Sequence, residues 1–392
     1  MVQKKKKPSG LRIVGVMTGT SCDGLDAACL EMDEAGWRPV WEASQPYPAS
    51  LRERVLGLQK PGTTLELEEV LRLDRDLGEW YGAAISRILK GRGRHADVVA
   101  SHGQTVAHHP AANRMGTTMQ LGDPTRIARA TGLTVVAAFR KGDMAAGGEG
   151  APLLPLFHRM LAAHLDRSGR GIAIHNLGGI SNLTYVAPGK NGAVLAFDTG
   201  PANIWIDAAV SMVTDGKQSY DENGRIGLKG RIDIEGVRRA LRHPYFRRPI
   251  PKSTGRDDFP FEHLLSSTRV RGADLVATAT AVTVESIGLA YEAWITGKRR
   301  PLGTVLLCGG GARNPLLVGW LQDRLSGIDV TPIEEVGLSS TLIEAQGFAF
   351  FGYLSLLGQP LGGPWTGAQG FGPPGQIVPG KNWPAVVEKL GR

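Results

Sequence analysis

The sequence has few cysteines and no long apolar segment, and these absences exclude several classes of protein. Its 392 residues include three cysteines, Cys22, Cys29 and Cys308, which show neither disulfide nor metal-ligand spacing. We therefore expect a reducing, cytoplasmic environment. No run reaches the roughly 18 apolar residues of a membrane span, and no signal-peptide core follows the basic N-terminal residues. We expect no association with a membrane.

Several catalytic signatures are missing as well. The chain has no GxxxxGK[ST] phosphate loop, no Gly-x-Ser-x-Gly elbow and no Cys/His pair that would indicate acyl transfer. We also expect no metal site made by protein groups alone, because the histidines lack metal-ligand spacing with acids. The histidines in question are His108, His109, His158 and His175.

Positive charge is concentrated at the start of the chain. The net charge is +8, and Lys4, Lys5, Lys6 and Lys7 supply half of it. No aromatic residues interleave with these lysines, which argues against binding of nucleic acid. We interpret residues 1–10 as a basic, disordered head.

The remaining sequence is typical of a folded α/β protein. Apolar residues make up 42% and charged residues 21%, and the length allows two medium-sized domains. Each half reads as three strands, a helix, a strand, a helix, a strand and a helix. Hydrophobic periodicity predicts long helices over Leu67–Ile88 in the first half and Ala273–Thr296 in the second.

A glycine-rich joint at Gly147–Gly150 separates the two halves, and we place the main domain boundary there. The first predicted domain covers 11–147 and is joined by the C-terminal segment 365–392. The second covers 148–364 and contains an insertion near 215–272.

The stretch from Leu11 to Glu31 organises the first half as strand, polar loop and strand. Between the apolar runs lies Thr18–Gly24, with two glycines, three hydroxyls and one carboxylate. Such residues suit a nucleotide phosphate, because glycine lets backbone N–H groups face an anion and an acid can hold a hydrated cation. An ordinary Gly/Asp hairpin turn explains this stretch equally well.

The second half has a matching polar turn, Asn176–Asn182, between its first two strands. Two like halves with Gly turns predict a cleft for a polyphosphate between mixed sheets, unlike the parallel Rossmann sheet. Because residue identity between the halves is low, this duplication is inferred from element order alone.

Asp198 ends the third predicted strand of the second half, just before a predicted helix that starts at Ala202. An acid at a strand end can act as a general base toward a hydroxyl or a water molecule. Alternatively, Asp198 only caps the helix, since an acid shortly before proline is a good helix start. The residues alone favour the cap.

Other polar loops follow predicted buried strands. His102 and Gln104 follow one of them and can hydrogen-bond sugar hydroxyls. Gly309–Gly311, followed by Asn314, permits close approach of a flat base. Lys252–Arg256 is a basic loop that suits a carboxylate or phosphate. Taken singly, each is also consistent with an ordinary solvated loop.

Together, these blocks resemble the anhydro-N-acetylmuramic acid kinases of the sugar kinase/actin/Hsp70 ATPase superfamily. The resemblance extends from about Gly15 to Phe350, over GVMTGTSCDGLD, SHGQT, QLGDP, AGGEGAPLLPLFH, NLGGISN, FDTGPANIWID, PKSTGR and CGGGARN. It implies a duplicated actin-like ATPase (ribonuclease H-like) α/β fold, with two domains whose mixed sheets flank an ATP cleft. It also implies a homodimer.

The family converts 1,6-anhydro-N-acetylmuramate, ATP and water into N-acetylmuramate 6-phosphate and ADP during cell-wall recycling. By resemblance, a base at Asp198 would activate the water that opens the 1,6-bridge, and O6 would take the γ-phosphoryl group. ATP and Mg²⁺ are the implied cofactors, and a small amino sugar is the implied partner, without nucleic acid or membrane.

The resemblance assigns further site residues. The implied ATP-binding residues are Gly19, Thr20, Ser21, Cys22, Asp23, Gly24, Leu25, Asp26, Asn176, Gly178, Gly179, Gly309, Gly310, Gly311 and Asn314. The implied substrate-binding residues are His102, Gln104, Arg140, Asn203 and Glu344. Asp23 would also hold Mg²⁺ through water, together with the phosphates.

Two residues depart from the family's pattern. Ala138 stands where the family usually has the acid of Asp-Phe-Arg, which removes a carboxylate that would orient Arg140 or the sugar. Glu149 stands where Gln is usual, and the sequence leaves open whether Asp143 or Glu149 replaces the missing acid. Two rival hypotheses remain, a kinase of the same fold for another amino sugar and a catalytically weak sugar- or nucleotide-binding sensor.

Overall fold

The computed structural model describes residues 10–19, 22–33, 36–58, 63–64, 66–109, 116–189, 192–250, 252–340, 342–369 and 374–391. Its contacts divide the chain into two units. Unit 1 comprises Met1–Phe157 and Leu342–Arg392, and unit 2 comprises His158–Thr341. Of the predicted site residues, Thr20 and Ser21 lie outside the described residues, as does the predicted head apart from Gly10.

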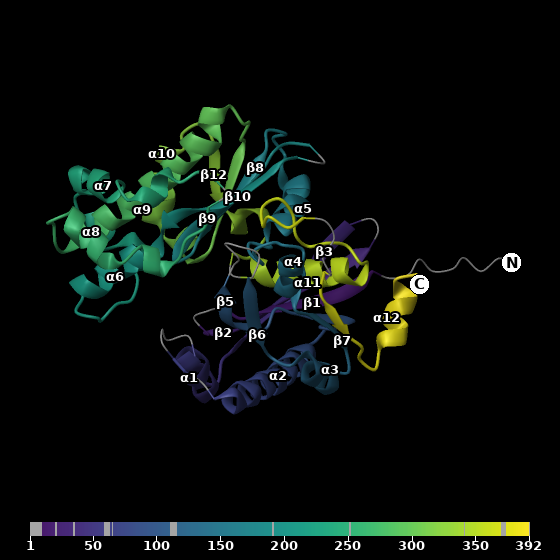
Figure 1. The fold of residues 1–392 in the computed structure, drawn as a ribbon. Coiled ribbons are helices and arrows are strands. Elements are labelled where there is room, and N and C mark those ends of the chain that lie inside the picture. Colours follow the sequence, from purple (N-terminus) through teal and green to yellow (C-terminus); the bar gives the residue numbers. More distant parts are fainter. Residues whose placement is uncertain are drawn as a thin grey trace. The chain divides into compact units, whose positions relative to one another are not determined.

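Unit 1 contains a six-stranded mixed sheet, a separate two-stranded sheet and helices (Figure 1). The strands of the large sheet are β1 (Leu11–Met17), β2 (Gly24–Asp33), β3 (Gly36–Pro46), β4 (Val98–Ser101), β7 (Thr134–Ala137) and β13 (Gln376–Val378), and those of the small sheet are β5 (Gln104–His109) and β6 (Thr117–Leu121). The helices are α1 (Ala49–Leu58), α2 (Leu67–Leu89), α3 (Pro124–Thr131), α4 (Phe139–Ala145), α11 (Ile343–Leu356) and α12 (Trp383–Lys389). The strand order of the large sheet is β13-β7-β4-β1-β2-β3.

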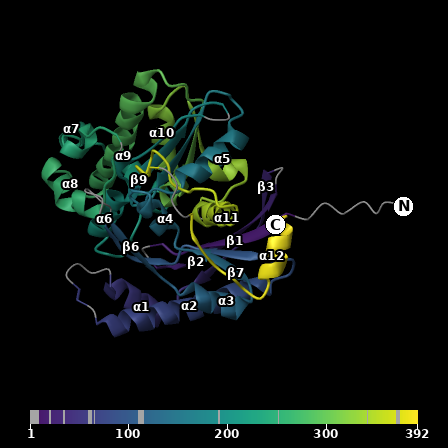
Figure 2. The same ribbon diagram turned by 45° about the vertical axis from the view of Figure 1, so that its right-hand side comes forward.

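Strand β1 shows how the sheet of unit 1 is covered. Successive side chains of a strand point to opposite faces. Val14 and Val16 belong to the core that includes Leu73 and Leu77 of α2. On the other face, a Cβ atom added at Gly15 would collide with the backbone of α11. Helix α11 therefore covers one face of the sheet, and α2 and α3 cover the other (Figure 2).

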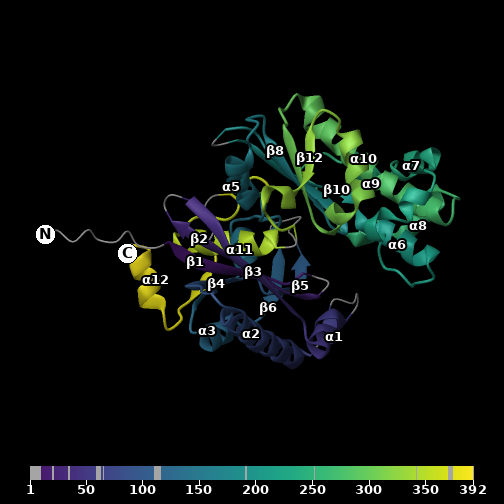
Figure 3. The ribbon, with the colours of Figure 1, turned by 180° about the vertical axis from the view of Figure 1, so that it is seen from behind.

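Unit 2 contains a five-stranded mixed sheet with the order β10-β9-β8-β11-β12. Its strands are β8 (Ile172–Leu177), β9 (Ile180–Val186), β10 (Val194–Pro201), β11 (Thr304–Cys308) and β12 (Asp329–Pro332). Its helices include α6 (Asn203–Val213), α7 (Ile234–Ala240), α8 (Phe261–Ser267), α9 (Ala273–Trp294) and α10 (Pro315–Arg324), and α5 (Pro155–Leu165) begins in unit 1. Helices α9 and α10 lie on one side of the sheet and α5 on the other (Figure 3).

The two large sheets share one topology. In each, the first strand pairs antiparallel with the second, and the second pairs antiparallel with the third. The first strand also pairs parallel with the fourth (β4 or β11). The fourth pairs parallel with a fifth, which is β7 in unit 1 and β12 in unit 2. This repeated arrangement is the ribonuclease H-like one. It confirms the predicted duplication and the actin-like ATPase fold class.

The unit boundaries lie elsewhere than the predicted ones at 147/148 and 364/365. The first boundary lies later because backbone contacts tie the glycine-rich joint into unit 1. Gly150 N donates to Asp143 Oδ2 (2.7 Å), and Glu149 N donates to Thr366 O (2.9 Å). The second lies earlier because α11 packs against β1 and thereby belongs to unit 1.

Helix α9 forms much of the core of unit 2. The segment Ala273–Lys298 is long and apolar enough to cross a membrane by length and composition, but 78% of its most apolar window is buried within the protein. Its side chains share one buried core with those of α6 and of the sheet, and that core includes Leu275, Val282, Trp205 and Leu183. We therefore interpret α9 as a core helix.

Candidate functional site

Asp198 lies on β10, the strand at one edge of the sheet of unit 2. The loop at Lys252–Thr254 runs along this edge. Asp198 N donates to Lys252 O (3.1 Å), and Thr254 N donates to Asp198 Oδ2 (2.8 Å). Tyr245 Oη donates to Asp198 O (2.7 Å). The basic loop noted in the sequence thus touches the predicted catalytic acid directly.

The surroundings of Asp198 make it a suitable base near neutral pH. Burial raises the pKa of Asp198 from 3.8 to about 6, although the Thr254 N–H group and the Lys252 ammonium partly oppose this rise. Burial, and to a smaller extent Arg248, lowers the pKa of Lys252 to about 8. A carboxylate with a pKa near 6 is mostly ionised at pH 7 and still binds a proton appreciably.

The structure does not support the alternative in which Asp198 caps the following helix. Helix α6 begins at Asn203, and its N-cap residue is Ala202, without a side-chain cap hydrogen bond. Strand β10 continues past Asp198 to Pro201, so Asp198 does not end the strand as predicted. Its carboxylate is instead held by Thr254 of the neighbouring loop.

The second polar turn is tighter than predicted and is fastened to α6. Strands β8 and β9 leave only Gly178 and Gly179 as the turn of the predicted Asn176–Asn182 segment. Asn203 N donates to Gly178 O (3.0 Å), and Asn203 Nδ2 donates to Leu177 O (2.8 Å). Asn203, predicted to bind the sugar, thus holds this turn at the start of α6.

The Gly309–Gly311 segment lies directly against this turn. Gly309 has a positive φ of 80°, and a Cβ atom there would collide with Asn176 Oδ1. A Cβ atom at Gly311 would lie 2.8 Å from Leu177 Cβ. Asn314 Oδ1 accepts from Leu316 N (3.1 Å) and so caps α10. The structure therefore brings together the predicted ATP-binding residues of unit 2.

Two further groups were not assigned from the sequence, Arg256 beside this turn and Asp207 near Arg256. A Cβ atom at Gly179 would lie 3.5 Å from Arg256 Nη2, so the Arg256 guanidinium is beside the turn. Burial raises the pKa of Asp207 to about 6, and Arg256 partly opposes this rise. The PKSTGR block had signalled a functional loop, but the sequence did not show which of its residues approach the turn.

In unit 1, the first polar loop is held by buried hydrogen bonds. Cys22 N donates to Gly19 O (3.1 Å), and Cys22 is buried with a positive φ of 55°. Gln104 Nε2 also donates to Gly19 O (3.3 Å), and Tyr47 Oη donates to Gln104 Oε1 (3.1 Å). Because Gln104 is fully buried and bonded at both ends, it is placed to support this loop.

Two carboxylates lie near each other at the start of β2. Asp23 is exposed and pairs with Arg52 at 3.5 Å, whereas Asp26 accepts from Ser44 Oγ at 2.6 Å. Burial raises the pKa of Asp26, and the nearby Asp23 adds to the rise. Within the described residues no group of three or more His, Cys, Asp or Glu side chains could hold a metal. Two carboxylates that supply hard oxygen donors nevertheless fit a hydrated Mg²⁺, which keeps several waters.

Gly24 and Leu25 were also predicted to bind ATP, and both lie on β2. Gly24 begins β2, and a Cβ atom there would lie 2.9 Å from Gln45 O of the neighbouring strand. The Leu25 side chain is fully buried in the core of unit 1.

His102, Arg140 and Glu344 form a second cluster in unit 1. Arg140 Nε donates to His102 Nε2 (2.9 Å), and Arg140 Nη1 donates to Gly150 O (2.8 Å). Burial, followed by the charge of Arg140, lowers the pKa of His102 well below 6.5, so its ring is neutral. Burial raises the pKa of Glu344, and Arg140 partly opposes this rise. This arrangement can bind a ligand that carries hydroxyl groups or an anion.

The structure shows what stands beside Arg140 in place of the acid missing at Ala138. Asp143 is buried, and its carboxylate accepts from Gly150 N (2.7 Å) and Thr366 Oγ1 (2.7 Å). It thereby fixes the Gly150 carbonyl that accepts from Arg140. Glu149 is exposed. Of the two acids weighed from the sequence, Asp143 is the one whose carboxylate supports Arg140.

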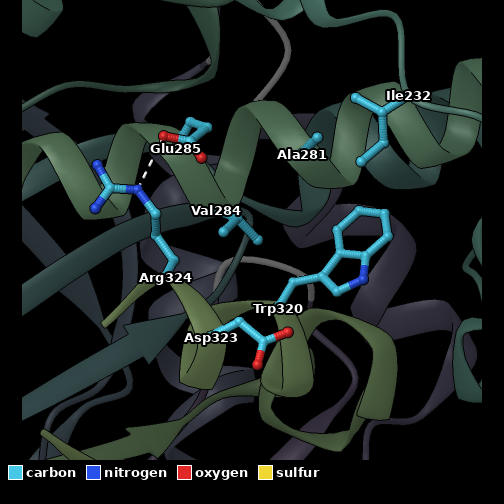
Figure 4. A pocket seen from close by; sticks show the side chains of 7 residues that line it. All are labelled: Ile232, Ala281, Val284, Glu285, Trp320, Asp323 and Arg324. Carbon is cyan, nitrogen blue, oxygen red and sulfur yellow. Dashed lines mark hydrogen bonds and ion pairs between the residues drawn. The ribbon is translucent and has the colours of Figure 1, made fainter. Parts of the chain in front are cut away.

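A pocket between α9 and α10 in unit 2 contains none of the predicted site residues (Figure 4). Its lining combines apolar side chains and an indole ring with three charged groups, and Arg324 Nε pairs with Glu285 Oε2 at 2.9 Å. The lining residues are Ile232, Ala281, Val284, Glu285, Trp320, Asp323 and Arg324.

Comparison with known proteins matches nearly the whole chain. A family model described as anhydro-N-acetylmuramic acid kinase matches residues 11–380. A protein of that name from Streptomyces coelicolor is 38% identical, covering 97% of both chains, and one from Acidithiobacillus ferrooxidans is 39% identical, covering 97% of this chain and 96% of its own. Among solved structures, a ROK family glucokinase from Streptomyces griseus covers 87% of this chain and 98% of its own, at 12% identity with a TM-score of 0.35.

Proposed function

Since this chain belongs to the anhydro-N-acetylmuramic acid kinase family, we propose that it opens and phosphorylates 1,6-anhydro-N-acetylmuramate with ATP during cell-wall recycling. The products would be N-acetylmuramate 6-phosphate and ADP. The observation that carries this proposal is the Asp198 carboxylate. Thr254 N occupies its Oδ2, and its Oδ1 makes no hydrogen bond to a described residue.

Asp198 acts as the general base in this proposal. Its free oxygen accepts a proton from a water molecule, the water oxygen bonds to C1 of the sugar, and the C1–O6 bond breaks. O6 then bonds to the γ-phosphorus of ATP as the bond to the β-phosphate oxygen breaks, which releases ADP. Thr254 and Tyr245 keep the carboxylate and its backbone in place during the reaction.

Other residues bind and orient the two substrates. The first loop (Gly19 and Cys22–Asp26), the Gly178–Gly179 turn with Asn176, and Gly309–Gly311 with Asn314 bind ATP; their glycines allow close backbone approach to phosphate and base. We assign Asn203 and the His102, Arg140 and Glu344 cluster to the sugar, with Gln104 supporting the first loop.

Asp23, with Asp26 beside it, would hold Mg²⁺ through water. When bound there, the ion would neutralise charge on the transferring phosphoryl group. We further propose that the enzyme is a homodimer in the cytoplasm. The three cysteines lack disulfide spacing in the sequence, which suits a reducing compartment, and all three are buried.

Substrate turnover tests this function. The protein is incubated with ATP, Mg²⁺ and one sugar at a time, and ADP release and product mass are measured. We expect ADP only with the anhydro sugar, and a product heavier than the substrate by one water and one phosphoryl group. Efficient turnover of another amino sugar would favour the same-fold rival that the Ala138 substitution suggests. Binding without turnover of any sugar would contradict a kinase.

A further inference from the structure

A chain of buried hydrogen bonds leads from the core of unit 2 to the residue that follows Asp198. Thr199 Oγ1 donates to Ser181 Oγ (2.7 Å), which lies 2.6 Å from His175 Nε2. His175 Nδ1 lies 3.1 Å from Tyr291 Oη. All four side chains are at most 1% exposed to solvent. The chain therefore has no access to water within unit 2 and is fixed by its own members.

The donors and acceptors along this chain are consistent with one direction. Because Thr199 donates to Ser181, the Ser181 hydroxyl hydrogen is available for His175 Nε2. His175 then carries its hydrogen on Nδ1 and donates it to Tyr291 Oη. Burial lowers the pKa of His175 to about 3, which agrees with a neutral ring that both accepts and donates.

The end of this chain coincides with an irregularity in β10. Pairing with β9 shifts between Asp198 and Gly200, so that Thr199 is the extra residue of a β-bulge. Gly200 has a positive φ of 135°, and a Cβ atom there would lie 2.6 Å from the Phe246 ring. A bulge bends the strand and re-aims neighbouring side chains, and it is often found next to active sites.

We propose that Thr199, Ser181 and His175 are positioning residues that hold this bulge and thereby aim the Asp198 carboxylate; this inference depends on the proposed role of Asp198. Which way the side chains beside a bulge point depends on which residue is left out of the ladder, and Asp198 directly precedes Thr199. The hydrogen bond from the Thr199 hydroxyl to Ser181 favours Thr199 as the extra residue of the bulge, because it holds this side chain in the core rather than in solvent. From the opposite edge, Tyr245 and Thr254 hold Asp198 itself.

Stability alone is a weak reason for such a chain. Polar groups buried in a core must all be satisfied, and apolar side chains of similar volume are often at least as stabilising. The hydroxyl–imidazole chain instead contributes specificity, because it fixes which residue of β10 is left out of the ladder. The expected consequence is an effect on the chemical step that exceeds any effect on folding.

The test uses the full-length protein and a series of matched variants. Thr199→Val keeps the shape of the side chain but removes its hydroxyl, and Thr199→Ser restores the hydroxyl. Thr184→Val is the control, because Thr184 Oγ1 is buried and bonds another buried histidine, His158 Nδ1, at 2.8 Å. Asp198→Asn is measured beside them. Turnover, KM for ATP and for the anhydro sugar, and thermal unfolding are recorded for each.

We expect Thr199→Val to lower kcat by about tenfold or more, with both KM values changed by less than about threefold. Thr199→Ser should recover most of this loss. Thr184→Val should unfold at about the same temperature as Thr199→Val and retain turnover within about threefold. This split between kcat and stability is not expected from a purely structural role.

Three outcomes with the Thr199 variants would overturn the inference. Thr199→Val could keep the turnover of the Thr184→Val control, Thr199→Ser could be as slow as Thr199→Val, or the loss could lie in KM alone. Each would show that the hydroxyl does not aim the base. If Asp198→Asn itself kept normal turnover, the proposed function of Asp198 would fail, and the inference with it. An inactive Asp198→Asn beside a normal Thr199→Val would refute the inference alone.

Discussion

Replacing Asp198 by Asn should abolish most activity while making the protein more stable at neutral pH. Asn keeps the size of Asp and can still accept from Thr254 N, but it cannot accept a proton. If Asp198 activates water, kcat should fall by roughly 10²–10⁴-fold. Binding of ATP and sugar should change far less, because the lost interaction is made mainly in the transition state.

The gain in stability follows from the raised pKa of Asp198. Its pKa is about 6 in the folded protein against 3.8 as the reference, so the folded state holds the proton more tightly. The stabilisation by this proton is fully present below pH 3.8 and is lost as pH rises through 6. Keeping the ionised group buried then costs about 3 kcal/mol at most, which Asn avoids. Below about pH 4, the two proteins should be equally stable.

The assay combines steady-state turnover with urea unfolding of both proteins at pH 7.5 and pH 4. We expect the unfolding midpoint of the variant to be higher at pH 7.5 and to match the wild type at pH 4. Near-wild-type turnover of the Asn variant would refute the role as base. A variant that is less stable than the wild type at pH 7.5 would refute the burial argument, whatever its activity.

Three further substitutions test other parts of the structure. Gly309→Ala should weaken ATP binding and destabilise the protein by about 2 kcal/mol or more in calorimetry and unfolding, because its positive φ and the adjacent Asn176 side chain exclude a Cβ atom. Ala138→Gly should raise stability by about 1 kcal/mol in urea unfolding, because Ala138 has a left-handed φ of 61°; an unchanged or lower midpoint would argue against strain there. Lys252→Met should raise the pKa of Asp198 and move the acid limb of the kcat/KM profile to higher pH, and a limb that stays in place would separate Lys252 from the base.

Hydrophobic periodicity was sufficient to predict the elements that are long or fully buried. The helix predicted over Leu67–Ile88 is α2, and the one predicted over Ala273–Thr296 is α9, each within two residues at either end. Short elements were missed because their residues carry little pattern. Helices α1 and α4 were not predicted, and β5 begins at Gln104, where a loop was predicted.

The features of the site that could not be predicted from the sequence depend on contacts between residues distant in the chain. Asp198 and Thr254 are 56 residues apart, and neither residue indicates the other as its partner. The same holds for the support of Arg140 by Asp143, which depends on where the backbone places the Gly150 carbonyl. A sequence motif shows that an acid is present at position 198. It does not show the raised pKa of Asp198, because that shift is caused by burial in the folded protein.

The two-segment composition of unit 1 bears on how the chain is made. Unit 2 is continuous, from His158 to Thr341, whereas unit 1 needs residues from Leu342 onward. During synthesis, β7 cannot pair with β13, and α11 cannot cover its face of β1, until the last fifty or so residues have been made. Domains generally fold as units during synthesis, so unit 2 has all of its residues available while unit 1 is still incomplete. A ribosome that stalls before Ile343 would therefore release a chain with an open sheet face, the kind of surface that chaperones recognise.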